Sequence, residues 1–365
     1  MTNHEHFSVG AALCLAVLGL QPHASAYEYW TCAGSKITWA SSSPEMRLAA
    51  GSFPIGAWRT AMTDALDAWS DGPADFEWDA KYNERGVSVG NFQNEAWFTN
   101  NATLLGGDPA RTLAWAYCAN WAEADIVFST SSSYSTSTDK TDLVPYGGND
   151  RPFQNTAIHE LGHALGLDHE NDEYNVMGEE WTHIHANGSS VHGYVGEDAF
   201  DGAFFLYGYR VVDDLGLVHW KWKGRDGEYS EHGRTVIYKK DGTYAEGFTD
   251  YGSNPNGEPG FMVTRGKTIL VELTFENNGD RSRQPLVEYY VSTNDYISIY
   301  DTYLADRRPM LSPDDVYTVT QEIVVPTSLT VGETYYIGAV VDPYDNVSEY
   351  DESNNATYIA IYIKG

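Results

Sequence analysis

The segment from His159 to His169 constrains this chain more than any other part of its sequence. It reads His-Glu-Leu-Gly-His-Ala-Leu-Gly-Leu-Asp-His. His159 and His163 are four positions apart, so on a helix of about 3.6 residues per turn both imidazoles lie on one face. Gly166 can take a positive φ and end the helix, which allows the chain to turn and bring His169 to the same point. The segment therefore predicts a helix, a turn and a metal site with three nitrogen ligands.

Glu160 directly follows the first of these histidines, so it lies beside the metal site and is not one of its ligands. Three protein ligands leave one coordination position of Zn2+ open, and a water molecule there has its pKa lowered to about 7. A carboxylate next to that position can accept the proton of the water. The pattern is typical of a zinc-dependent hydrolase with Glu160 as catalytic base. The alternatives are a chance pair of helical histidines and a metal site without activity.

This segment resembles the signature of the metzincin zinc peptidases, His-Glu-x-x-His-x-x-Gly-x-x-His, and residues 175–178 resemble the Met-turn of that family. The turn methionine, Met177, lies 8 residues after His169, as in the matrixin branch. Glu170 after the third histidine is instead as in astacins. Glu179 stands where astacins and serralysins have a tyrosine, so a tyrosine ligand is not expected. The resemblance implies one catalytic Zn2+ above a hydrophobic floor formed by Met177.

The resemblance extends over roughly residues 27–210 and implies an α+β catalytic domain, with a twisted mixed sheet and an active-site helix. Residues 124–129 resemble the central strand of the family, residues 112–117 the edge strand of its substrate cleft, and residues 196–208 its last helix. An edge strand has unpaired amides, so an extended peptide can add to it. We therefore expect polypeptide substrates. The expected substrate-binding residues are Leu113, Ala114 and Trp115 on the edge strand, and Asn155, at the position that sets the depth of the S1′ pocket in matrixins.

Two polar segments near the motif could bind further metal ions. Residues 129–155 are rich in Ser, Thr, Asp and Gly, and Asp139, Asp142, Asn149 and Asp150 could hold Ca2+, with a solvated loop as the alternative. Matrixins hold a second zinc in the corresponding loop, but the histidines for it are missing here. Residues 179–195 contain His183, His185 and His192 without a tight ligand spacing, and resemble the outer wall of the pocket for the residue after the scissile bond.

The start of the chain predicts secretion. Residues 9–20 form an apolar run, and Ala24-Ser25-Ala26 is typical of a signal-peptide cleavage site, so residues 1–26 are expected to be removed and no membrane anchor to remain. In an oxidising compartment the two remaining cysteines, Cys32 and Cys118, are expected to form a disulfide. The alternative is that Cys32 blocks the zinc, as a propeptide cysteine does in matrixin zymogens, although the surrounding zymogen pattern and a recognisable propeptide are absent.

The charge of the chain excludes one class of partner. With 52 acidic and 22 basic residues the formal net charge is −30, and no basic stripe relieves it. Phosphate backbones would be repelled, so nucleic-acid binding is not expected. Anionic membrane surfaces are disfavoured for the same reason.

After Arg210 the sequence predicts strands in place of helices. Strands are expected at 267–276, 286–292, 317–325, 334–341 and 356–363, and short strands at this spacing suggest an all-β immunoglobulin-like sandwich. Residues 258–365 resemble the bacterial cell-adhesion-related domain called CARDB. Residues 211–257, with strands expected at 218–222 and 234–238, form either a β-rich linker or the first strands of the sandwich.

The sequence therefore predicts a multidomain, secreted, extracellular bacterial protein. The expected function is zinc-dependent endopeptidase cleavage of extracellular proteins, with a surface or protein partner for the sandwich. The alternative is an adhesion or binding protein in which the metzincin part is an idle scaffold.

Overall fold

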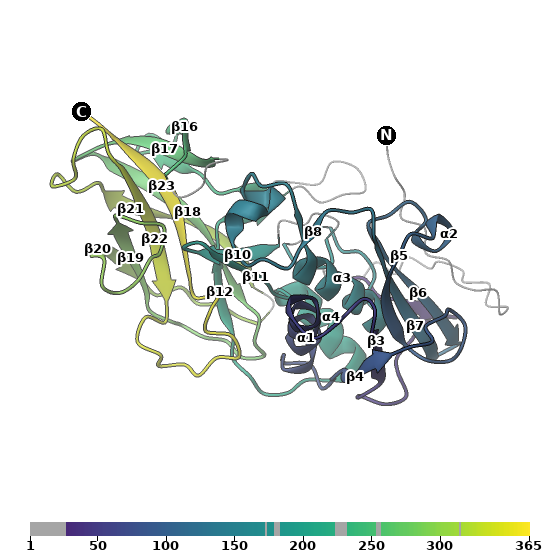
Figure 1. Ribbon diagram of the computed structural model, residues 1–365. Coiled ribbons are helices and arrows are strands. Elements are labelled where there is room, and N and C mark those ends of the chain that lie inside the picture. Colours follow the sequence, from purple (N-terminus) through teal and green to yellow (C-terminus); the bar gives the residue numbers. More distant parts are fainter. Residues whose placement is uncertain (1–26, 172–173, 179–182, 223–231, 253–256, 314) are drawn as a thin grey trace.

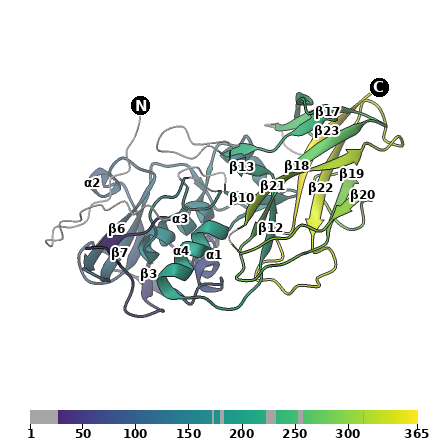
Figure 2. The same cartoon turned by 180° about the vertical axis from the view of Figure 1, so that it is seen from behind.

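A computed structural model describes residues 27–171, 174–178, 183–222, 232–252, 257–313 and 315–365. The expected signal peptide and Glu179 lie outside these ranges. Figure 1 shows an N-terminal α+β domain beside a C-terminal β-sandwich, with the main helices between the N-terminal sheet and the sandwich. Figure 2 shows the same order from behind. Within the described ranges, no helix is long and apolar enough to cross a membrane.

The N-terminal domain is built on a five-stranded sheet in the order β4-β3-β5-β7-β6. The first four strands in this order pair in parallel, and β6 pairs antiparallel with β7. The strands are β3 (Glu45–Ala49), β4 (Asp79–Glu84), β5 (Glu95–Thr99), β6 (Ala110–Tyr117) and β7 (Asn120–Ser129). The predicted edge strand is thus the edge strand β6. The strand predicted to be central, residues 124–129, is part of β7. It lies one place from the edge, because β6 folds back beside it, and β5 occupies the centre of the sheet.

Helices cover one face of this sheet. They are α1 (Ala57–Ser70), α3 (Phe153–Leu165) and α4 (Glu197–Tyr207). The short α2 (Ala102–Leu105) lies on the other face, where Leu105 packs with Trp97 of β5 and Val127 of β7. Buried apolar side chains of α1, α3 and α4 form one core with the sheet, and Trp69 of α1 donates a hydrogen bond from its indole to the carbonyl of Ile158 (2.9 Å). This core fixes α3, which carries most of the histidine motif, against the sheet.

Short elements complete the N-terminal domain. They are β1 (Thr31–Cys32), β2 (Ser35–Lys36), β8 (Tyr134–Ser135), the 3-10 turns η1 (Lys140–Asp142) and η2 (Val144–Tyr146), β9 (Arg151–Pro152), β10 (Ile184–Asn187) and β11 (Ser190–Gly193). Strands β10 and β11 pair antiparallel as a hairpin. Figure 1 places this hairpin between the helices and the sandwich.

The C-terminal sandwich has two sheets around one apolar core. One is six-stranded in the order β16-β17-β23-β22-β19-β20, and in the other β12, β15 and β21 all pair with β18. The long strands are β17 (Glu258–Thr264), β18 (Thr268–Asn277), β19 (Val287–Ser292), β20 (Thr302–Arg307), β21 (Val316–Val324), β22 (Thr334–Val341) and β23 (Ala356–Lys364). The five strands predicted after residue 260 agree with β18, β19, β21, β22 and β23 to within a residue or two.

The stretch 211–257 contributes strands to both sheets of the sandwich. Its strands are β12 (Leu215–Val218), β13 (Trp220–Trp222), β14 (His232–Arg234), β15 (Ile237–Lys239) and β16 (Glu246–Asp250). Each of the two strands predicted here is wrong as a single strand, because its halves pair in different sheets. Strands β12 and β15 pair with β18, whereas β13 and β14 pair with each other.

Candidate metal centre

Three imidazoles converge at the end of α3. The Nε2 atom of His163 lies 3.0 Å from that of His159 and 3.2 Å from that of His169, and the His159–His169 separation is 3.2 Å. Nitrogen ligands about 2.0–2.1 Å from a tetrahedral Zn2+ would be about 3.3 Å apart. Within the described parts of the chain, no other group of three or more His, Cys, Asp or Glu side chains brings its ligand atoms together in this way. The donor set fits Zn2+.

Backbone carbonyls hold two of these rings in the orientation that a metal ligand needs. His159 donates from Nδ1 to the carbonyl of Val176 (2.7 Å), and His163 from Nδ1 to the carbonyl of Leu167 (3.0 Å). A proton on Nδ1 leaves the Nε2 lone pair free for a metal ion. Burial, followed by the two facing imidazoles, lowers the pKa of His163 well below its usual value, so that ring is neutral at neutral pH.

The third histidine depends on how α3 ends. Gly166 has φ 128°, a conformation that disfavours other residues, and its amide closes the last turn on the carbonyl of Gly162 (3.1 Å). The chain then reverses, and His169 returns to the ring pair on α3. The role predicted for Gly166 is therefore present in the fold.

Glu160 points from α3 toward the edge strand. Its side chain is buried, and Oε2 accepts a hydrogen bond from the hydroxyl of Thr112 on β6 (2.7 Å). The same hydroxyl also lies 2.9 Å from the backbone carbonyl of Glu160. Thr112 thus connects the candidate base to the edge strand. Sequence reasoning missed Thr112, because a threonine in a strand is ordinary and only the tertiary contact distinguishes it.

Met177 packs against α3. A Cβ atom on Gly162 would be only 2.3 Å from the Met177 sulfur, so the thioether packs against α3 between the turns that carry His159 and His163. Asn175 fixes the turn by accepting from the Met177 amide (2.6 Å) and donating to Asp198 of α4 (3.1 Å). Helix α4 therefore holds the Met-turn in place.

Two family models match separate regions of the chain. Residues 33–198 match the model described as Matrixin, and residues 260–358 match the model described as CARDB. The chain has an N-terminal matrixin-like domain and a C-terminal CARDB domain. The matrixin match supports a metallopeptidase. No curated protein shows significant similarity to the chain.

Solved structures similar to the chain include CARDB domains. A crystal structure of the CARDB domain of a Pyrococcus furiosus protein, in complex with di-metal ions, is 16% identical, covers 42% of this chain and 96% of that one, and has a TM-score of 0.26. A solution structure of the same domain is 18% identical, with coverages of 42% and 98% and a TM-score of 0.25. A Niemann-Pick type C2 protein from Japanese carpenter ant is 9% identical, with coverages of 40% and 98% and a TM-score of 0.22. At TM-scores this low, the similarities add nothing to the family-model matches.

The edge strand of the matrixin-like domain offers one side for a further strand. Strand β6 pairs only with β7 among the described strands. Of the predicted substrate-binding residues, Leu113 is buried and Ala114 and Trp115 are partly exposed. An edge with free backbone groups can pair with an extended chain.

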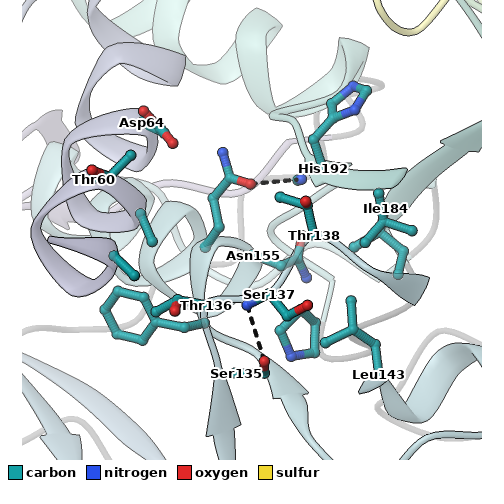
Figure 3. Close-up of a pocket in the computed structure, with 17 residues that line it drawn as sticks. Thr60, Asp64, Ser135, Thr136, Ser137, Thr138, Leu143, Asn155, Ile184 and His192 are labelled. Carbon is teal, nitrogen blue, oxygen red and sulfur yellow. Dashed lines mark hydrogen bonds between the residues drawn. The ribbon is translucent and has the colours of Figure 1, made fainter. Parts of the chain in front are cut away.

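A pocket of about 200 Å³ adjoins the start of α3 in the matrixin-like domain (Figure 3). Asn155, one turn before His159, lines it together with Thr60 and Asp64 of α1 and with Ile184 and His192 of the β10–β11 hairpin. The Asn155 side chain is buried, and its Oδ1 has no hydrogen-bond partner among the described residues. The predicted pocket residue therefore lines a pocket, but none of the three motif histidines does.

The two cysteines of the matrixin-like domain face each other, with Cys32 in β1 and Cys118 at the end of β6. Their sulfur atoms are 2.7 Å apart. The disulfide stays a prediction. The alternative in which Cys32 blocks the metal site is wrong for the described residues, because the Cys32 sulfur is not part of the converging ligand group.

The four candidate calcium ligands do not form a converging group of carboxylates. Asp139 caps η1 by accepting from the amide of Thr141 (3.0 Å), and Asp150 accepts from the hydroxyl of Ser133. The amides of Asn149 and Asp150 both donate to the carbonyl of Asp142 (3.1 and 3.0 Å). Hydrogen bonds within the loop therefore hold these residues, as expected for the solvated-loop alternative.

The three histidines after the Met-turn, His183, His185 and His192, contact other protein groups and do not form a second metal site among the described residues. His183 is buried and bonds through Nδ1 to the carbonyl of Tyr194 (3.1 Å). His185 and His192 lie opposite each other in the β10–β11 hairpin, and burial lowers the pKa of His185 to about 3. They do not converge with a third ligand side chain among the described residues. The hairpin instead lines the pocket at Asn155.

Proposed function

We propose that this chain is a secreted zinc-dependent endopeptidase that hydrolyses peptide bonds of extracellular proteins, with Glu160 as the catalytic base. The observation that carries the proposal is the convergence of three imidazole nitrogens, 3.0–3.2 Å apart, beside the buried carboxylate of Glu160. The matrixin match over residues 33–198 supports the same class of enzyme.

His159, His163 and His169 would hold the ion. Bound there, Zn2+ supplies a Lewis acid that polarises the scissile carbonyl and lowers the pKa of a water molecule to about 7. Glu160 takes the proton of the attacking water at its carboxylate and passes it to the leaving amine. Thr112 orients that carboxylate through its hydroxyl, and the Val176 and Leu167 carbonyls keep two of the imidazoles in the required tautomer.

The substrate is proposed to lie extended along β6. Its backbone would pair with the free edge at Leu113, Ala114 and Trp115, and the residue after the scissile bond would enter the pocket at Asn155. Main-chain pairing binds many sequences, whereas the pocket selects among side chains. The unpaired Oδ1 of Asn155 gives this pocket a polar element.

Hydrolysis of casein or gelatin by the purified mature chain tests the proposal. We expect cleavage that stops with a zinc chelator and returns when Zn2+ is added back. Glu160→Ala should lower the rate by roughly 10²- to 10⁴-fold, because general-base catalysis contributes about that much. The variant should still bind one zinc per chain, since its three ligands are unchanged.

Glu322→Ala is the matched control, because Glu322 is an exposed residue of the sandwich strand β21. It should cleave like the wild type. If the wild type binds zinc stoichiometrically and cleaves none of several denatured proteins, the peptidase proposal fails. The secreted binding protein with an idle matrixin-like scaffold would then be the better account, as the CARDB match allows.

A further inference from the structure

Residues 183–195, here called the cleft-wall segment, are held between the matrixin-like domain and the CARDB sandwich. Figure 1 shows the two strands of this segment, β10 and β11, between the helices and the sandwich strands. A CARDB domain that merely docks the enzyme on a surface would not need such a position. The contacts on each side of the segment therefore bear on what the sandwich does.

The inner side of the cleft-wall segment lies against the start of α3 and against the Met-turn. Gly193 donates its amide to the side chain of Gln154 (3.2 Å), and a Cβ atom on Gly193 would be 3.2 Å from the Cα of Asn155. Val195 accepts from the amide of Val176 (3.0 Å), whose carbonyl in turn accepts from His159. The segment thus supports both the pocket at Asn155 and the Met-turn.

The outer side of the segment forms hydrogen bonds with the sandwich. Some lie at the tip of the β10–β11 hairpin, and another lies near the end of the segment. At the tip, Asn187 exchanges two hydrogen bonds with the backbone of Ile297 (2.9 and 2.8 Å), and Gly188 donates to the carbonyl of Asp295 (2.8 Å). Near the end, the hydroxyl of Tyr194 donates to the buried Glu276 of β18 (3.1 Å). Between these points, Thr357 of β23 donates to the carbonyl of Ala186 (3.1 Å).

A buried ion pair reinforces the tip. The backbone amide of Lys140 donates to the carbonyl of Ser189 in the segment (2.9 Å), and the Lys140 side chain is fully buried. The ammonium lies 2.7 Å from carboxylate oxygens of Glu258 and Asp295, both in the sandwich. A buried ammonium that lost these partners would be left uncompensated, so the contact resists separation of the domains.

Apolar packing joins the same surfaces. One buried cluster contains side chains from the matrixin-like domain and from the sandwich: Leu143, Tyr146, Ile184, Ala186 and Val191 on one side, and Tyr290, Ile297, Tyr336, Tyr358 and Ala360 on the other. A shared core, hydrogen bonds and a buried ion pair together are typical of a fixed domain interface and not of a flexible linkage.

We propose that the CARDB sandwich is a structural part of the substrate cleft. In this proposal it positions the cleft-wall segment through Asp295, which pairs with Lys140, and through Glu276, which accepts from Tyr194. The position of the cleft-wall segment does not depend on the proposed peptidase function, whereas an effect of the sandwich on substrate binding does. The sandwich should matter even for a peptide too short to reach it.

Asp295→Ala in the full chain tests this inference, with a short fluorogenic peptide as substrate. We expect KM to rise at least fivefold with kcat changed less than twofold, because the pocket wall is displaced while Glu160 and the zinc ligands remain. A general loss of folded enzyme would instead lower kcat and leave KM unchanged. Asp295→Asn, which keeps an oxygen acceptor for Lys140, should be milder. Asp306→Ala, an exposed aspartate of β20, should behave like the wild type.

Amide hydrogen exchange gives a readout that does not depend on activity. Residues 183–195 should exchange at least tenfold faster in Asp295→Ala than in the wild type. If that variant does not fold, Tyr194→Phe removes only the hydroxyl bond to Glu276, with Tyr303→Phe on the exposed face of the sandwich as its control. Faster exchange confined to the sandwich, with KM unchanged, would overturn the inference. If the wild type cleaves nothing, the peptidase proposal fails while exchange still decides the role of the sandwich.

Discussion

At the scale of single residues, the motif glycine Gly162 leaves the space that Met177 fills. A Cβ atom there would lie 2.3 Å from the Met177 sulfur and 2.9 Å from a ring carbon of Trp69. These distances are below van der Waals contact, so a side chain at 162 would have to move its neighbours. The glycine is therefore required by packing under the histidines, in addition to any helix preference.

Gly162→Ala should lower the free energy of unfolding by about 1–3 kcal/mol, the usual range for overpacking a well-packed core. In a Met177→Ala background the same change should cost at least ~1 kcal/mol less, because the crowded thioether is gone. Denaturant unfolding of the four chains of this double-mutant cycle measures the difference. Equal costs in both backgrounds would mean that Met177 does not occupy the space beside Gly162.

At the scale of secondary-structure elements, the start of strands β5 and β7 carries three buried carboxyl groups. Glu123 accepts from the backbone amides of Gly90, Asn91 and Phe92 (2.6–3.0 Å), and so fixes the loop before β5. Asp125 accepts from the amide of Glu95 (3.1 Å). Burial, together with the neighbouring Glu123 and Glu95, raises the pKa of Asp125 to about 10. The folded protein therefore holds a proton on Asp125 at neutral pH.

This proton makes stability depend on pH. Because the pKa of Asp125 is 3.8 when unperturbed and about 10 in the fold, its contribution is fully present below pH 3.8 and is lost as pH rises toward 10. Asp125→Asn removes the ionisable group and keeps the acceptor for Glu95, so its unfolding free energy should fall less steeply with pH.

Urea unfolding at pH 5, 7 and 9 measures these slopes for the wild type, Asp125→Asn and the exposed control Asp306→Asn. The control should follow the wild type. The same slope in Asp125→Asn as in the wild type would contradict a protonated Asp125 in the folded chain.

At the scale of the whole molecule, the described parts of the two domains contact each other in more than one region. One is the interface around Lys140 and the cleft-wall segment. At another, Tyr350 of the sandwich lies against Phe200 of α4 and donates to the carbonyl of Ala68 in α1 (3.2 Å). Cooperative unfolding of both domains follows if these contacts stabilise each domain as much as its own core does.

Calorimetry of the wild type should therefore show a single unfolding transition. Lys140→Met should lower the free energy of unfolding by about 3 kcal/mol, because the buried Glu258 and the partly buried Asp295 lose the Lys140 ammonium, and Arg234 stays near Glu258 only at 3.7 Å. Lys240→Met is the control, since Lys240 forms an exposed pair with Glu322 (3.4 Å), and should cost at most about 1 kcal/mol. Two separate transitions, with only the sandwich affected by Lys140→Met, would show that the domains unfold independently.

The sequence by itself determined the features that depend on local spacing. Helical periodicity placed His159 and His163 on one face, Gly166 marked the turn to His169, and alternating apolar residues located the main strands of the sandwich to within a residue or two. Local patterns are sufficient here because the helical and strand repeats act over a few neighbouring residues.

Only the tertiary structure decided which distant residues meet. Thr112 reaches Glu160 across 48 positions, and Lys140 reaches Tyr358 across 218. The strands expected at 218–222 and 234–238 were each divided because their halves pair with different partners. Such pairing depends on burial and on hydrogen bonds between segments that are remote along the chain, which no local repeat encodes. For the same reason, the sequence located the histidine motif, and only the fold placed the CARDB sandwich against residues 183–195.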